Sequence, residues 1–427
     1  MACVVLTFAL AVRVPGAAGA APGSDPTIVQ TDKGAVHGSG ANGVRTFLGI
    51  PFAAPPVGPL RLRPPKPATA WTGVREALQP SAACPQTEPP AQNTTEDCLY
   101  LNVWTPAGAS RAPVLVFIYG EDFTHGNGAA YDGALLATSG KIVVVTMNYR
   151  TGILGFLANS ALDDGGSTTG NYGLEDQQAA LRWVQRNIGA FGGDPRNVTL
   201  GGESAGAVST CANLASPGSG GFVRAIVQSG PCSVPLPTLA SVEAAQATIA
   251  AQLGCPGTGA PVAACLRSPE LTVQKILAVQ QTLPRGTFSP SVEGSDIPVQ
   301  PRTYLGRLPL LLGGDSSSPA PQQSICDDVA SWRLTRATSG APIYGYEFND
   351  PKTTESADLF PNPRTPASEA LSTSMIAYWK NFVTTGDPNG PGLPQWPAYK
   401  LDTDAMQLVP SGVTTGTDVG AEHKCKP

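Results

Sequence analysis

The sequence is poor in charged residues and in histidine. Charged side chains make up 14% of its 427 residues, the formal net charge is −5, and three histidines occur. A weakly acidic balance offers no electrostatic reason to bind nucleic acid or an anionic membrane surface. Because no Cys-x-x-Cys pair accompanies the few histidines, no structural zinc site is expected, and no metal or other cofactor is predicted.

Long apolar runs are missing beyond the N-terminus. Residues 1–20 are apolar and end in Ala18-Gly19-Ala20, which fits the small-residue site of signal peptidase. The alternative for this segment is a buried N-terminal strand. No later run is long and apolar enough to span a bilayer. We therefore expect a signal peptide over residues 1–20 and a secreted protein without a membrane anchor.

The cysteine count agrees with secretion. Of nine cysteines, Cys3 lies in the predicted signal peptide, and the remaining eight are an even number, as suits an oxidising compartment. Their spacing suggests the pairs Cys84–Cys98 and Cys255–Cys265. The cysteines left for two further bridges are Cys211, Cys232, Cys326 and Cys425.

Apolar runs and helical patterns alternate along the chain. The runs are rich in β-branched residues and predict strands buried on both faces of a mainly parallel sheet. These strands are expected at residues 112–120, 141–150, 197–202 and 224–230. Helical patterns occupy residues 176–192 and 203–216, so the order predicts a doubly wound α/β fold. Residues 27–60 predict a short β-ribbon ahead of this unit.

The last third of the chain is less regular. Residues 313–324 are expected to form a loop, and the pattern stays weak up to Ser339. A late helix is predicted from Pro366 to Gly386, because proline suits a first helical turn and glycine ends a helix. Its apolar face, which we expect to pack in the core, consists of Leu371, Met375, Tyr378 and Phe382.

One short stretch indicates nucleophilic chemistry. In "GGESAGA", Ser204 follows a predicted strand and precedes a predicted helix, as in the tight turn called a nucleophile elbow. Such a turn needs small neighbours, here Gly202, Ala205 and Gly206. The Ala205 amide at the helix N-terminus is suited to donate to an oxyanion.

The same region resembles a known family. Phe191–Ala207, "FGGDPRNVTLGGESAGA", is similar to the nucleophile signature of the type-B carboxylesterases, the cholinesterase-like α/β-hydrolases, in particular their secreted bacterial branch. "EDCLYLNVW", at Glu96–Trp104, resembles the second signature of that family, and further blocks follow in the family order over residues 27–410. The resemblance implies one α/β-hydrolase domain over residues 21–427, with a mostly parallel central sheet flanked by helices and an N-terminal β-ribbon.

The resemblance also implies chemistry and bridges. It implies hydrolysis of small carboxylic esters through an acyl-serine at Ser204, with Glu203 and Gly120 lining the cleft. It supports the two disulfides suggested by spacing. It adds Cys326–Cys425, which leaves Cys211–Cys232 as the fourth bridge.

The predicted oxyanion loop departs from the family pattern. Where the family has a run of glycines, this chain has Glu121 and Asp122 before Phe123. One hypothesis is that both acids turn to solvent while the loop keeps its conformation and its oxyanion amides. Another is that a carboxylate repels the developing oxyanion, since loss of one donor costs about 10²–10³ in rate. A third is that a carboxylate acts as a base for the water that attacks the acyl-enzyme.

The other two triad positions also depart from the family. An ungapped count puts Ser318 at the position of the family acid, and Asp315, the nearest carboxylate, is the candidate acid; the alternative is a loop aspartate that caps a turn. The interval Asn349–Pro366, where the family has its histidine, contains none, and Glu355 stands at the matching position. The segment between acid and histidine is also shortened, which indicates loss of helical elements.

Three histidines remain as candidate bases. His125 follows the altered loop and is expected to line the cleft, so it is the candidate replacement base. His37 lies in the predicted ribbon and His423 near the C-terminus, both expected far from Ser204. A surface or structural role is the alternative for each.

Three hypotheses for function follow. The first is a secreted carboxylesterase whose partner is a small ester substrate and whose activity is weak. The second is a catalytically inactive family member that acts as a binding protein. The third is a shortened member that folds without a function. The intact Ser204 turn favours the first, and the missing histidine favours the others, because triad members act as a unit.

Overall fold

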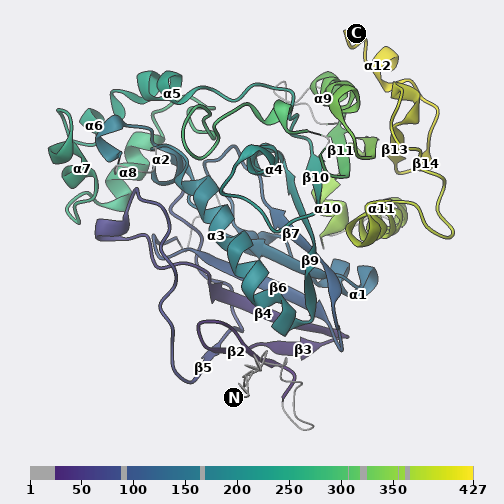
Figure 1. Ribbon diagram of the computed structural model, residues 1–427, viewed down its shortest axis with the longest axis horizontal. Helices are drawn as coiled ribbons and strands as arrows, with labels where there is room; N and C mark the ends of the chain where they lie inside the picture. The colour runs from purple at the N-terminus through teal and green to yellow at the C-terminus, as the bar shows by residue number, and fades with distance from the viewer. Residues whose placement is uncertain are drawn as a thin grey trace, which may run out of the picture.

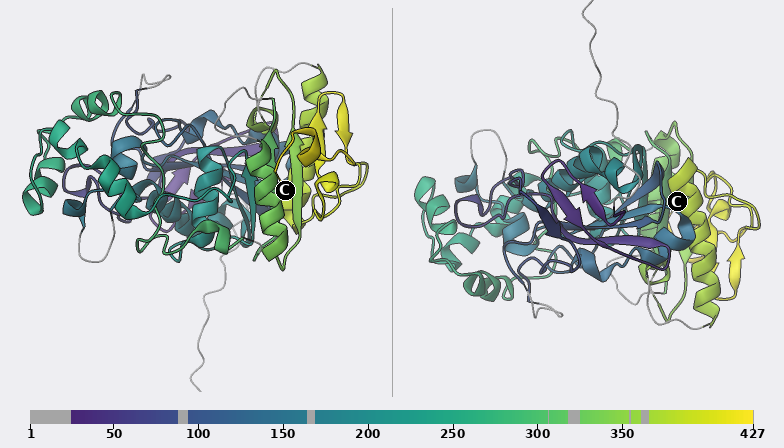
Figure 2. Two further views of the ribbon diagram at one scale, coloured as in Figure 1. Left: turned by 90° about the horizontal axis from the view of Figure 1, so that it is seen from above. Right: turned by 90° about the horizontal axis from the view of Figure 1, so that it is seen from below.

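The computed structural model describes residues 25–87, 94–163, 169–305, 307–317, 325–353, 355–360 and 366–426. The predicted signal peptide, residues 1–20, and Ser318 lie outside these residues. Figure 1 shows a twisted central sheet with helices on both of its faces. In Figure 2 the teal and green helices of residues 239–280 lie at one end of the molecule, and the yellow C-terminal segment lies at the other.

Eleven strands of the described chain form one sheet in the order β14-β13-β12-β11-β10-β9-β7-β8-β6-β4-β3. The neighbours from β8 through β7, β9, β10, β11 and β12 to β13 pair in parallel, and the pairs at both edges are antiparallel. The strands are β3 Ser39–Ala41, β4 Val44–Pro51, β6 Tyr100–Pro106, β7 Ala112–Ile118, β8 Val143–Met147, β9 Gly193–Glu203, β10 Arg224–Gln228, β11 Leu310–Asp315, β12 Ile343–Phe348, β13 Met406–Val409 and β14 Gly412–Thr414. The strands expected from the apolar runs are therefore present.

The predicted N-terminal ribbon is divided between two sheets. Strands β1 Ile28–Gln30, β2 Ala35–His37 and β5 Val74–Glu76 form a small separate sheet. Strands β3 and β4 instead extend the edge of the large sheet.

Helices cover both faces of the large sheet (Figure 1). They are α1 Ala134–Gly140, α2 Gly152–Phe156, α3 Tyr172–Asn187, α4 Ala205–Ala215, α5 Leu239–Gln246, α6 Ile249–Gln252, α7 Ala260–Leu266, α8 Val273–Gln280, α9 Ile325–Thr338, α10 Glu355–Leu359, α11 Pro366–Thr385 and α12 Val419–Glu422. Short 3₁₀ turns occur at Gly58–Leu60, Gly128–Ala130, Ser160–Leu162, Ile188–Phe191, Pro301–Thr303 and Asp402–Asp404. Within the described chain, no helix combines the length and apolar character needed to cross a membrane.

Side-chain alternation along the central strands builds two cores. In β7, Val114 and Val116 pack in the cluster that contains α3 residues such as Val184. Leu115 and Phe117, which point to the other face, pack in the cluster of α11. Because both faces are covered, β7 is apolar at every position, as expected for a buried parallel strand.

The late helix α11 confirms the prediction for this segment. Its predicted face, Leu371, Met375, Tyr378 and Phe382, is buried in the core. The ring of Tyr378 contacts Trp396 edge-on, and the neighbouring Trp379 contacts Tyr346 in the same way. The aromatic residues therefore serve packing.

Helix α9 was not predicted, because its buried side is partly polar. Ile325, Val329 and Trp332 are buried on it together with Asp328 and Thr335. This mixture weakens the apolar periodicity by which an amphipathic helix is recognised from sequence.

Four disulfides link the described chain. Cys84 pairs with Cys98, Cys211 with Cys232, Cys255 with Cys265, and Cys326 with Cys425. The last bridge spans 99 residues and joins α9 to the C-terminal segment. These are the pairs that the family resemblance implies.

A buried ion pair joins the loop after β8 to α3. Arg150 Nε lies 2.8 Å from Asp176 Oδ2, and Arg150 Nη2 lies 2.8 Å from Asp176 Oδ1. The two side chains are 3% and 0% exposed. The Arg150 backbone amide also donates to the same carboxylate, at 3.1 Å. The pair therefore fixes both the backbone and the side chain of the loop.

Replacing Asp176 is expected to destabilise the fold strongly. In Asp176→Asn the Arg150 charge stays buried beside a neutral partner, so the free energy of unfolding should fall by about 3–5 kcal/mol. Urea unfolding measures this change. The control is Asp32→Asn, whose pair with Arg186 is exposed and should contribute no more than about 1 kcal/mol. Equal losses in the two variants would contradict the prediction.

Candidate active site

The turn between β9 and α4 holds Ser204 in a strained conformation. Ser204 has φ 56° and ψ −122°, which an L-residue adopts only when its surroundings impose it. A Cβ on Gly206 would lie 2.0 Å from the carbonyl oxygen of Ile118, and one on Gly202 would lie 2.3 Å from that of Gly206. The two glycines are therefore required for this turn, and the strand–turn–helix arrangement expected of a nucleophile elbow is present.

Ser204 lines a hollow beside the N-terminus of α4. Although serine is a favoured helix cap, the side chain of Ser204 does not cap α4. Gly120 packs against it, since a Cβ there would lie 2.8 Å from Ser204 Cβ. Ala205 opens the first turn of α4, where amides point along the positive end of the helix dipole. Ser204 and the first amide of α4 are thus side by side.

The hollow at Ser204 has the size and lining of a small-ligand site. Its volume is about 440 Å³, within the usual range for such sites. The walls are mainly apolar, with Arg285 as the cationic group. The lining residues are Asp122, Phe123, Ser204, Ala205, Val208, Val234, Pro235, Leu236, Pro237, Arg285, Gly286, Phe288 and Ser289.

The altered loop after β7 keeps a backbone suited to glycine. Glu121, Asp122 and Phe123 have φ values of 72°, 53° and 59°, in the left-handed region that costs about 1–2 kcal/mol per L-residue. The loop is fastened where the Gly152 amide donates to the Phe123 carbonyl at 2.7 Å. Glu121 and Asp122 are exposed. Asp122 nevertheless lines the hollow at Ser204. The loop thus keeps its conformation, as the first hypothesis expects, but only Glu121 lies outside that hollow.

His125 is held by its own loop. Its Nε2 lies 3.1 Å from Glu121 Oε2, and its Nδ1 lies 3.0 Å from Thr124 Oγ1. The hydrogen bond from His125 is the main reason that the pKa of Glu121 is lowered. His125 lines a neighbouring hollow of about 430 Å³ and is not among the residues that line the hollow at Ser204.

The other histidines each contact a glutamate elsewhere in the fold. His37, on β2, lies 2.9 Å from Glu76 on β5. His423, directly after α12, lies 2.7 Å from Glu347 on β12. All three histidines of the chain belong to the described residues, and none lines the hollow at Ser204.

Comparison with known proteins agrees with this geometry. A model of the carboxylesterase family matches residues 25–319. The chain belongs to the carboxylesterase family. Cocaine esterase of Homo sapiens is 32% identical, covering 87% of this chain and 85% of its own length. Fumonisin B1 esterase of Sphingopyxis macrogoltabida is 42% identical, covering 70% of this chain and 57% of its own length.

Solved structures identify the fold as the α/β-hydrolase fold. A structure titled PNB esterase has a TM-score of 0.80 at 30% identity, covering 94% of this chain and 99% of that one. A carboxylesterase of Geobacillus stearothermophilus gives 0.80 and 30%, covering 93% and 99%. The alignment with the human relative has 485 positions, more than the 427 residues here. It therefore includes segments that this carboxylesterase-family chain lacks.

Asp315, the candidate acid, ends β11 at the same edge of the sheet as Ser204. Its Oδ1 accepts hydrogen bonds from the Ser317 amide at 2.8 Å and the Ser317 hydroxyl at 2.6 Å. Its backbone amide donates to Ser229 Oγ at 3.0 Å. The carboxylate thus closes its own turn, as the alternative interpretation of Asp315 expects.

Glu355, the residue predicted to stand at the position of the family histidine, is buried away from solvent. It begins α10 and is 1% exposed. The hydroxyls of Ser229 and Tyr346 both donate to its carboxyl group. Burial raises the pKa of Glu355 to about 8, and the charges of Glu203 and Asp315 contribute to the rise. At neutral pH this carboxyl group is therefore largely protonated.

Further acids share this region. Burial raises the pKa of Glu203 to about 7, with smaller contributions from Glu121 and Asp315. Burial raises the pKa of Asp328 well above its usual value, and Glu355 adds to this. Such neighbours share protons because several adjacent buried charges are too costly. Sequence analysis missed Asp328, Ser229 and Tyr346, and the local sequence holds no signal for them.

Replacing Glu355 is expected to change the pH dependence of stability. The folded-state pKa of about 8 exceeds the ordinary 4.5, so the stability that this group contributes is fully present below pH 4.5 and is lost as the pH rises toward 8. Wild type should lose on the order of 3 kcal/mol between pH 4.5 and 7 from this group. Glu355→Gln keeps the shape and cannot ionise, so it should escape that loss.

Urea unfolding at pH 5 and pH 8 measures this effect. The free energy of unfolding of Glu355→Gln minus that of wild type should be larger at pH 8 than at pH 5, which means that the variant gains stability relative to wild type as the pH rises. Glu270→Gln, at an exposed position, is the control and should follow wild type. Parallel profiles for Glu355→Gln and wild type would show that Glu355 is ionised in the fold, contrary to the expectation.

Proposed function

We propose that this carboxylesterase-family chain hydrolyses small carboxylic esters through an acyl-serine at Ser204, and that it does so slowly. The observation that carries the proposal is the strained turn that presents the Ser204 hydroxyl to a hollow of about 440 Å³. Strain of this kind persists only where the surrounding structure maintains it. Two relatives are named as esterases of cocaine and of fumonisin B1, which supports an ester as the substrate class.

The proposed reaction has two steps. Ser204 Oγ attacks the ester carbonyl carbon, the Ala205 amide donates to the oxyanion, and the bond to the alcohol oxygen breaks. The alcohol leaves with a proton and the acyl group stays on Ser204. Water then attacks the acyl-serine and releases the carboxylic acid and the free hydroxyl.

The proton of Ser204 is the weak point of this mechanism. An intact triad uses a histidine to remove it, whereas His125 lies against Glu121 and Thr124. We propose that the proton passes to solvent. When a triad is disabled, residual catalysis of about 10³–10⁴-fold over water remains from the oxyanion site and from binding. This is the level of activity that we expect.

We also propose that the protein is secreted and that residues 21–427 form a single domain. Residues 1–20 would be removed as a signal peptide. The four disulfides support an oxidising compartment, because such bridges persist outside the reducing cytosol.

A binding protein without catalysis is the second candidate function. Glu355, at the position of the family histidine, is engaged by Ser229 and Tyr346, which favours a structural role for that position. A binding protein would keep the hollow at Ser204 and have no reactive hydroxyl. Active-site labelling distinguishes the two candidates.

Ser204→Ala is expected to abolish labelling by a fluorophosphonate. Wild type should be labelled at one site per chain and should hydrolyse a p-nitrophenyl ester slowly, because the reagent and the ester both require the serine nucleophile. Intact-mass spectrometry locates the label. Ser289→Ala removes another hydroxyl from the same hollow and should keep both properties. A wild-type protein with neither labelling nor turnover would favour the binding protein.

Glycine at positions 121 and 122 is expected to raise both stability and activity. Relief of about 1–2 kcal/mol of strain per position exceeds the entropy cost of glycine, so unfolding should cost about 0.5–1 kcal/mol more per position. The change also removes two carboxylates near the oxyanion and releases His125. We expect kcat/KM to rise by about tenfold or more.

Two further variants separate charge from backbone effects. Glu121→Gln with Asp122→Asn removes the charge and keeps side chains of the same size, so it should raise kcat/KM less than the glycine pair does. Asn42→Gly, at another left-handed position in the β3–β4 turn, should change stability and leave the rate unaltered. An unchanged rate in both pairs would show that the two acids do not limit catalysis.

A further inference from the structure

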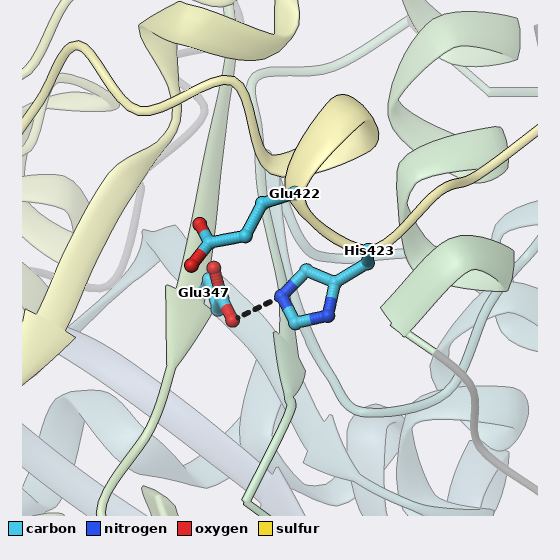
Figure 3. A group of neighbouring side chains, drawn as sticks. All are labelled: Glu347, Glu422 and His423. Carbon is cyan, nitrogen blue, oxygen red and sulfur yellow. Dashed lines mark hydrogen bonds and ion pairs between the residues drawn. The ribbon is translucent and has the colours of Figure 1, made fainter.

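A second group of chemically active side chains lies far along the sheet from Ser204, at the C-terminal segment. Figure 3 shows Glu347 on its strand with Glu422 and His423 reaching it from α12 and the residue that follows. One ligand atom from each residue lies within 4.8 Å of the other two. Two carboxylates and an imidazole in this arrangement are the donor types that bind divalent transition metals.

Glu347 is the buried member of this group. It is 1% exposed, and its Oε1 accepts a hydrogen bond from His423 Nε2 at 2.7 Å. Its Oε2 is fully buried and has no hydrogen-bond partner in the described part of the chain. A buried carboxylate oxygen without a partner is costly. Within the described part of the chain, no donor therefore satisfies this oxygen.

The carboxylate of Glu422 adds a second negative group beside Glu347. Figure 3 shows the Glu422 carboxylate facing Glu347 from the side away from the imidazole ring. Two adjacent carboxylates repel each other unless a proton or a cation lies between them. A cation at this point would neutralise both and would also satisfy the buried Glu347 Oε2.

We propose that Glu347, Glu422 and His423 bind one divalent transition-metal ion of the Zn²⁺ type. Zinc takes imidazole nitrogen and carboxylate oxygen at about 2.0–2.2 Å in a tetrahedral site, so its donors lie about 3.3 Å apart. Donors within 4.8 Å of one another reach that spacing by small side-chain movements. The His423 Nε2–H gives up its proton to solvent when the nitrogen bonds to the metal, and water fills the fourth position.

The ligand types also determine which ions the site selects. Ca²⁺ and Mg²⁺ prefer sites made of oxygen donors, whereas one of the three donors here is an imidazole nitrogen. Ligand spacing in the sequence predicts no such site, because Glu347 and His423 are separated by 76 residues. The fold brings them together because α12 packs against α9 and His423, the next residue, contacts Glu347 on β12.

The C-terminal segment is already positioned for binding. Cys425, two residues after His423, is joined to Cys326 on α9. Arg333, also on α9, forms an ion pair with Asp402 ahead of α12. These ties fix α12 before any metal arrives, which lowers the ordering cost of binding. The metal would add a direct tie between α12 and the sheet.

Zinc binding by the full-length mature chain tests the proposal. The chain is prepared without a histidine tag and is stripped with a chelator, then titrated with Zn²⁺ by calorimetry. We expect one Zn²⁺ per chain and a rise in the thermal unfolding midpoint with Zn²⁺. Ca²⁺ and Mg²⁺ at the same concentration should produce no rise.

Two variants assign the site. Glu422→Gln and His423→Asn should each weaken Zn²⁺ binding by about tenfold or more, since even outer-shell changes cost 10–100-fold. Glu422 is exposed, so its variant should fold as wild type does. His37→Asn is the matched control, because His37 forms a similar pair with Glu76 outside the group and should bind Zn²⁺ as wild type does.

Three results would overturn the proposal. The first is no Zn²⁺-dependent change in wild type. The second is unchanged Zn²⁺ affinity in Glu422→Gln. The third is an equal response to Ca²⁺. None of them depends on esterase activity, so the proposal stands or falls independently of the proposed function.

Discussion

The close packing of β7 against the turn that follows β9 is the constraint on which the site depends. The Ile118 carbonyl lies where a Cβ of Gly206 would be, so the turn exists only because residues 202 and 206 lack side chains. That approach is set by the parallel pairing of β7 with β9. It forces Ser204 into its positive φ and starts α4 directly behind it. The sheet therefore determines where Ser204 lies and which backbone conformation it adopts.

The same end of the sheet collects acids whose pKa values are raised by burial. Glu355 accepts hydrogen bonds from Ser229 and Tyr346, and Ser229 in turn accepts one from the amide of Asp315. Burial raises the pKa values of Glu355 and Glu203 toward neutrality. A protonated carboxyl group packs and donates like an amide. The surroundings of Glu355 thus form a network of hydrogen bonds.

Sequence patterns predicted the features that depend on local repetition. The buried strands, α11 and the Ser204 turn follow from apolar periodicity and from glycine at fixed positions. Helix α9 was missed because Asp328 and Thr335 interrupt its apolar side. The contact of His125 with Glu121 depends on the path of one loop. The contact of His423 with Glu347 joins two segments that are 76 residues apart in the sequence. Contacts of these two kinds leave no periodic trace in a single sequence.

The loop after β7 links the loss of glycine to the loss of a base. Its backbone remains left-handed over Glu121, Asp122 and Phe123, so acids occupy positions whose geometry suits glycine. Such strain persists only where other interactions offset it. The Glu121–His125 pair, which closes the loop on itself, is one such interaction. The imidazole nearest in sequence to the oxyanion site is thereby engaged by a carboxylate that glycine would not have supplied. Glu121 thus both occupies a strained left-handed position and pairs with His125, the candidate replacement base.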